Sequence, residues 1–94
     1  GTLEKLRKAV YLIWRKPYMT INRHTFIHAM MEKAGFENVF ADKSDNYPVI
    51  SENEIVQSGA DIILLSSEPY HFTEKHIPEF SSLLPGTEIR LVDG

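Results

Sequence analysis

The chain has no cysteine, no long apolar run and no excess of basic charge. The absence of cysteine excludes disulfide bonds and thiolate zinc sites, and it is compatible with an oxidising or a reducing compartment. The longest apolar runs, at 9–14 and 62–65, are far shorter than the roughly 20 residues that cross a bilayer. The first residues lack the apolar core and cleavage site of a signal peptide, so we expect any export signal to lie upstream.

Charge and size narrow the class of protein further. The net charge is −3, so no broad basic face is available to bind nucleic acid or anionic lipid, and nucleic acid is not an expected partner. The chain is 43% hydrophobic and 24% charged, which is typical of a globular protein. Its 94 residues suffice for one compact domain and are too few for two.

The first half of the chain alternates between strand and helix patterns. Residues 8–14 are rich in β-branched and aromatic side chains and predict a buried strand. Apolar residues recur every three or four positions over 23–34, which predicts an amphipathic helix with Asn22 as a possible N-cap and Gly35 at its end. Residues 37–40 predict a short second strand.

The second half continues the same alternation, with helices and strands expected at 51–58, 61–66, 75–84 and 88–92. Ser51 and Glu54 form a Ser-x-x-Glu capping box at the start of the first of these helices. The uninterrupted apolar strand 61–66 is typical of a parallel sheet covered on both faces. The order β-α-β-α-β-α-β therefore predicts an α/β fold, with a parallel four-stranded, Rossmann-like sheet and helices on both faces.

Ligands of open α/β sheets bind beyond the carboxyl ends of the strands, and the loops expected there are rich in aromatic residues. The candidate ligand-binding residues in these loops are Trp14, Arg15, Tyr18, Tyr47, Glu68, Tyr70 and His71. The aromatic rings suit a large, flat or partly apolar ligand, while Arg15 and Glu68 can orient it through polar contacts. The alternative is that about half of these side chains pack inward at the edge of the core.

Motifs for catalysis, cofactors and metals are missing. Ser66 and Ser67 follow a strand without a Gly-x-Ser-x-Gly elbow, and the chain has neither dinucleotide nor P-loop glycine motifs. No aspartate follows the central strand as a phosphoacceptor. His24 and His28 are one helical turn apart, but a metal site would also need a third ligand such as His71. We therefore expect neither an enzyme nor a resident metal or cofactor.

Five segments occur in an order and spacing that resemble a known family. They are Trp14-Arg15-Lys16-Pro17, Thr25-Phe26-Ile27, Gly35-Phe36-Glu37-Asn38-Val39-Phe40, Tyr47-Pro48-x-Ile50-Ser51 and Ala60-Asp61-Ile62-Ile63-Leu64. Together they resemble the C-terminal lobe of the helical-backbone substrate-binding proteins of ABC importers for cobalamin and ferric chelates. The resemblance covers almost the whole chain.

The resemblance implies a solute-binding component and a position for its ligand. In that family, two α/β lobes are joined by one long helix and bind the ligand in the cleft between them. Residues 1–7 would end that helix and 8–94 would form the C-terminal lobe, so a missing N-terminal lobe would supply half of the site. Trp14 and Tyr47 would lie at the ligand face, with the 68–72 loop close by, and cobalamin, a ferric siderophore or haem would be the ligand.

The resemblance also implies an ABC permease as partner and a periplasmic or other extracytoplasmic location, with or without a lipid anchor. The family docks on its permease through an acidic residue near the start of the helix that begins here at Ser51. The usual acidic position falls on Asn53, so Glu52 and Glu54 on either side are the candidate docking residues.

A second hypothesis belongs to a different class of protein. The chain could be a free-standing flavodoxin-like domain that acts as an enzyme subunit or as a protein-interaction module with aromatic contact loops. Gene length separates the two hypotheses. The first requires a homologous α/β half, a connecting helix and a signal peptide upstream, whereas the second predicts a protein that begins near residue 1.

Overall fold

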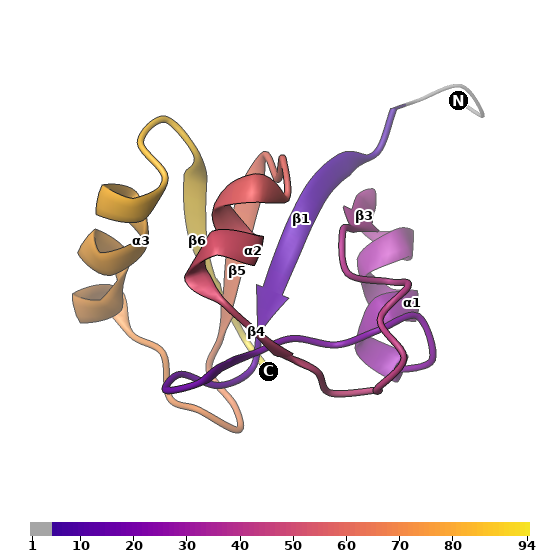
Figure 1. The fold of residues 1–94 in the computed structure, drawn as a ribbon. Coiled ribbons are helices and arrows are strands. Elements are labelled where there is room, and N and C mark those ends of the chain that lie inside the picture. Colours follow the sequence, from indigo (N-terminus) through magenta and orange to yellow (C-terminus); the bar gives the residue numbers. More distant parts are fainter. Residues whose placement is uncertain (1–4) are drawn as a thin grey trace.

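The computed structural model describes residues 5–94, which form one α/β unit (Figure 1). Its elements are β1 Arg7–Leu12, β2 Tyr18–Met19, α1 Phe26–Lys33, β3 Phe36–Asn38, β4 Val49–Ile50, α2 Glu52–Gln57, β5 Ile62–Ser66, the 3-10 helix η1 Glu74–His76, α3 Ile77–Leu83 and β6 Glu88–Val92. Residues 1–7 were expected to form the end of a helix, and residues 1–4 of this range lie outside the described residues. Lys5 and Leu6 are not helical and Arg7 begins β1, so the expectation is wrong for that part.

The main sheet confirms the predicted parallel topology. Its four strands lie in the order β3-β1-β5-β6, and all three neighbouring pairs are parallel. Strand β5 is central and all five of its residues are buried, as its apolar sequence indicates. The carboxyl ends of β1 and β5 therefore lie next to each other at one edge of the sheet, where the aromatic loops begin.

Side chains alternate between two cores, one on each face of the sheet. Val10 and Ile63 point toward α2 and α3, where they pack with the buried Ile55 and Phe80. Residues of opposite parity in the same strands, such as Tyr11, pack on the other face with α1. Figure 1 shows α1 and the pair α2 and α3 separated by the strands. The prediction of helices on both faces is thus confirmed.

Helix ends agree with the sequence in one case and differ in another. The Ser51 side chain accepts from the Glu54 N–H while the Glu54 carboxylate accepts from the Ser51 N–H, so the capping box is confirmed. The expected cap Asn22 is wrong because Thr25 caps α1 by accepting from the N–H of His28. Asn22 instead lies buried before the helix, where its side chain donates to the Lys43 carbonyl in the loop after β3 and accepts from the His24 N–H.

Two other features differ from the sequence pattern. The helix expected at 75–84 is divided into η1 and α3, because Pro78 lies in the first turn of α3 and donates no N–H. In addition, β2 and β4 form a small antiparallel ribbon that the sequence did not indicate. This ribbon lies at the carboxyl edge of the main sheet and becomes part of the candidate site.

The α1 face of the molecule carries an apolar groove of about 560 Å³ between the helix and the ends of β5 and β6. Phe26 and Met30 on α1 line it and are 79% and 54% exposed. Among residues 5–94 no helix has the length and apolar character needed to span a membrane.

Candidate ligand-binding edge of the sheet

The loops that follow β1 and β5 are joined at the carboxyl edge. The backbone N–H of Tyr70 donates to the carbonyl of Ile13 over 3.1 Å, which fixes the two loops together. The Trp14 and Tyr70 rings meet edge to face, with 5.5 Å between their centroids. Trp14 remains 38% exposed and Tyr70 half-buried, so this pair offers an aromatic surface supported from below.

The ribbon extends this surface toward Tyr47. Trp14 bridges to Met19, and Met19 pairs with Val49 across the antiparallel ribbon. Tyr47 lies two residues before Val49, in the bend that leads into β4. Tyr47 and Val49 are 55% and 57% exposed. We call Trp14, Met19, Val49 and Tyr47 the apolar strip.

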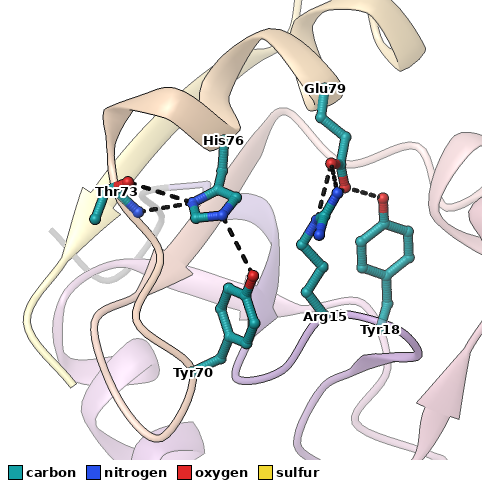
Figure 2. A network of polar contacts seen from close by, with 6 residues as sticks. All are labelled: Arg15, Tyr18, Tyr70, Thr73, His76 and Glu79. Carbon is teal, nitrogen blue, oxygen red and sulfur yellow. Dashed lines mark hydrogen bonds and ion pairs between the residues drawn. The ribbon is translucent and has the colours of Figure 1, made fainter.

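Arg15 and Tyr18 belong to a polar network that the sequence did not reveal (Figure 2). The Arg15 guanidinium donates to the Glu79 carboxylate from Nε over 2.9 Å and from Nη2 over 2.6 Å. The Tyr18 hydroxyl donates to the other carboxylate oxygen of Glu79. Both members of the ion pair are about one quarter exposed, with side-chain exposures of 23% and 27%.

The network shifts the ionisation of all three groups. The Arg15 hydrogen bonds hold the pKa of Glu79 below its ordinary value, although partial burial opposes this effect. Hydrogen bonding to Glu79 raises the pKa of Arg15, and desolvation together with the Glu79 carboxylate raises the pKa of Tyr18. Tyr18 is therefore a neutral phenol at neutral pH. The Arg15 guanidinium and the Tyr18 hydroxyl both point toward the Glu79 carboxylate.

The structure places the other candidate residues at the same edge but in different environments. Glu68 and His71 are exposed on the loop after β5. The Ser66 hydroxyl holds this loop, because it donates to the Glu68 carbonyl over 2.6 Å and accepts from its N–H. The Lys16–Pro17 and Glu68–Pro69 peptide bonds are both cis. The loop thus presents two ionisable side chains next to the Trp14–Tyr70 pair.

The two acidic candidates at the start of α2 are not equivalent. Glu54 accepts from the Ser51 N–H and from the Lys43 ammonium group, and the Lys43 hydrogen bond lowers its pKa most. Glu52 is exposed and lines a hollow of about 430 Å³ together with Arg15 and Lys16. Of the two carboxylates, Glu52 is therefore the more accessible to a partner.

A histidine metal site finds no support in the part of the chain that the structure describes. Within residues 5–94, no three His, Cys, Asp or Glu side chains converge as metal ligands. His28 lies instead beside the Asn38 amide at 3.3 Å and the Glu32 carboxylate at 3.6 Å. The convergence of His24 and His28 with a third ligand such as His71, which a metal site would need, is not found among these residues.

Two residues of the site were not identified from the sequence. Glu79 has the appearance of a surface residue on an amphipathic helix, and nothing in the pattern indicates that it reaches Arg15, 64 positions away. His76 is only 7% exposed, accepts a hydrogen bond from the Thr73 N–H and contacts Tyr70 and Phe72. Both residues support the aromatic loops from the side of α3.

The fold is that of one lobe of the substrate-binding proteins of ABC transporters, as the resemblance predicts. No family model matches the chain, and no curated protein matches it significantly in sequence. Solved structures match it over nearly its whole length. The periplasmic vitamin B12-binding protein BtuF of Vibrio cholerae matches 97% of this chain with a TM-score of 0.75 and 17% identity.

Two further structures have the same fold. An ABC transporter substrate-binding protein from Listeria monocytogenes matches 98% of the chain at a TM-score of 0.77 and 19% identity. The periplasmic haem-binding protein HutB of Vibrio cholerae matches 97% of the chain at a TM-score of 0.75 and 18% identity. The chain spans only 36%, 40% and 39% of BtuF, the Listeria protein and HutB, respectively, which is about the share of one lobe.

Proposed function

We propose that the chain is the C-terminal lobe of a solute-binding protein that captures a metal chelate between two lobes and delivers it to an ABC permease. The observation that carries this proposal is the apolar strip beside the Trp14–Tyr70 pair, at the sheet edge where α/β folds bind ligands, in a lobe whose fold matches binding proteins for vitamin B12 and haem. Cobalamin, haem and a ferric siderophore are the candidate ligands.

The chemistry of this edge suits a large ring better than a small polar solute. Exposed Trp14 and Tyr47 can stack on or flank a flat ligand, and Met19 and Val49 add apolar contact between them. Glu68 and His71 can orient polar substituents from the neighbouring loop. Arg15 and Tyr18 take a supporting part, because Glu79 already binds their polar atoms.

No covalent step belongs to this function. Capture requires only that the two lobes together remove the ligand from water, since concave and largely apolar sites bind by burying most of the ligand surface. The proposal places the protein in the periplasm or, on a lipid anchor, outside the cytoplasmic membrane. A homologous N-terminal lobe of the same protein would supply the opposite wall.

Ligand capture is tested by isothermal titration calorimetry of the two-lobed protein with cobalamin, haem and a ferric siderophore. We expect saturable binding of one of them. Trp14→Ala and Tyr47→Ala should each weaken it at least tenfold, because an aromatic contact is lost. Phe26→Ala is the matched control, because this 79% exposed aromatic lies on α1 rather than at the edge. Equal affinities for all three variants would contradict the assigned ligand face.

Permease docking is tested by ligand uptake in vesicles that contain the permease. Because Glu52 is exposed whereas Glu54 is bound by Lys43, Glu52→Gln should reduce uptake more strongly than Glu54→Gln. Ligand affinity should stay unchanged in both variants. A larger effect of Glu54→Gln, at unchanged stability, would reassign the docking residue. No effect of either would remove the start of α2 from the docking surface.

A further inference from the structure

A buried histidine lies behind the aromatic pair at the candidate ligand face. His76 is 7% exposed, and its ring packs against Tyr70 and Phe72 with centroid separations of 5.5 and 5.4 Å. Tyr70 in turn packs against Trp14. Figure 2 shows His76 pointing from the η1–α3 junction toward the Tyr70 hydroxyl. His76 is thus separated from the exposed Trp14 ring by one side chain.

Backbone contacts define which nitrogen of His76 carries the proton. The N–H of Thr73 donates to Nδ1 over 2.9 Å, so Nδ1 acts as an acceptor and is unprotonated. The proton of the neutral ring therefore lies on Nε2, which faces the Tyr70 hydroxyl at 3.3 Å. This tautomer connects the start of η1 with the hydroxyl of Tyr70 through one imidazole ring.

We propose that His76 positions the Trp14–Tyr70 pair and that protonation of its imidazole rearranges this pair. The inference rests on the proposed function for its biological meaning, but its geometry does not depend on any ligand. A second proton must go to Nδ1, where it would face the N–H of Thr73 donor to donor. The ring then has to shift from the Thr73 N–H toward the Thr73 hydroxyl oxygen, which lies 3.5 Å from Nδ1 and can accept its proton, and this shift changes the support that holds Tyr70 against Trp14.

The charges around His76 come from three elements. Glu79 on α3 interacts with it electrostatically, and the Arg15 guanidinium after β1 lies close to Tyr70. Glu74 and Lys75 on η1 are exposed, so water screens both. The Glu79 carboxylate is already bound by Arg15. Protonation of His76 therefore acts mainly on the hydrogen bond from the Thr73 N–H, which it turns from attractive to repulsive. The expected response is a loosened aromatic pair at low pH and a fixed pair at neutral pH.

Trp14 is the single tryptophan of the chain, so its fluorescence reports on this site alone. The experiment follows Trp14 emission of the ligand-free 94-residue chain from about pH 8 to about pH 5, the range in which imidazoles gain a proton. Far-UV circular dichroism at each pH monitors the fold. We expect a sigmoidal change in emission with the slope of a single proton, while the circular dichroism stays constant.

The variants separate His76 from the other histidines. In His76→Asn the side-chain oxygen can still accept from Thr73 but does not titrate, so the transition should be lost. Tyr70→Phe keeps the ring and deletes the hydroxyl, so the amplitude should fall. His71→Gln removes the exposed histidine next to Tyr70 and should leave the transition intact.

The inference is overturned by a flat emission profile in the unmodified chain, by an unchanged transition in His76→Asn or Tyr70→Phe, or by its loss in His71→Gln. These outcomes concern the ligand-free protein, so they are distinct from a failure to bind any chelate. If both proposals hold, the affinity of the two-lobed protein for its ligand falls across the same pH range, and His76→Asn removes that dependence.

Discussion

Replacing Glu79 by alanine should destabilise the fold more than any other change at an equally exposed carboxylate. The substitution removes the acceptor of two Arg15 hydrogen bonds, at 2.9 and 2.6 Å, and of the Tyr18 hydroxyl. Hydrogen bonds to charged groups contribute about 1.5–3 kcal/mol each when buried, but water can partly replace them at a site that is one quarter exposed. We expect a loss of about 2 kcal/mol in the free energy of unfolding.

The assay is urea and thermal unfolding of the 94-residue chain at pH 7, followed by circular dichroism. For a domain of this size, a loss of about 2 kcal/mol lowers the melting temperature by roughly 8–16 °C. Glu74→Ala is the matched control, because this exposed carboxylate on η1 should cost less than about 0.5 kcal/mol. If Glu79→Ala costs no more than Glu74→Ala, the network contributes nothing to stability.

The same network predicts a pH dependence with a definite sign. Because the pKa of Glu79 is lower in the folded protein than in the unfolded chain, its contribution is present above its unfolded pKa. The contribution is lost as the pH falls through the folded pKa. Stability should therefore decrease on acidification below about pH 4.5, and Glu79→Gln should show a smaller decrease. Parallel pH profiles of the two proteins would refute this assignment.

Three further predictions concern the scaffold, each measured by urea unfolding. Phe80→Ala should cost about 3–5 kcal/mol because the ring is fully buried, whereas Phe26→Ala on the open groove should cost far less. Ser51→Ala should lower the free energy of unfolding by about 1 kcal/mol, because the capping box is lost. The control Ser82→Ala, at an exposed serine, should lower it by less than about 0.5 kcal/mol. Gly35→Ala should cost about 1 kcal/mol because its φ of 91° is unfavourable for a residue with a Cβ. A neutral result in any of the three would contradict the role given to that residue.

Much of the fold could be predicted from local patterns, because those patterns have short-range physical causes. The apolar run at 61–66 produced a central strand, and the Ser51–Glu54 pair produced its capping box. The last strand was predicted at 88–92 and occurs there. In each case, either the interacting groups lie within a few residues of each other or the residues of the strand alone are enough to predict it.

The rest depends on contacts between distant residues. The β2–β4 ribbon has two residues in each strand, too few for any periodic pattern, and it forms because residues 30 and 32 positions apart meet. The Arg15–Glu79 pair likewise depends on the approach of α3 to the loop after β1. At α1, Thr25 rather than Asn22 became the cap, since Asn22 was buried among backbone partners of the neighbouring loop.

The site shows the same division. The sequence placed Trp14, Tyr47 and Tyr70 in loops at one sheet edge, and the structure joins the first and last of these directly. The roles expected for Arg15 and Tyr18 could not be separated from the scaffold, because their partner Glu79 is remote in sequence. Which of these residues contact a ligand stays a prediction until binding is measured.

The central claim is that this edge forms one wall of a chelate-binding cleft, and Trp14 fluorescence tests it most directly. The two-lobed protein is titrated with cobalamin, haem and a ferric siderophore, with emission corrected for the absorbance of each ligand and with Trp14→Phe as the blank. The account predicts saturable quenching of Trp14 by one ligand at a single stoichiometric site. Unchanged Trp14 emission with all three ligands, in a protein that calorimetry shows to bind one of them, would contradict it.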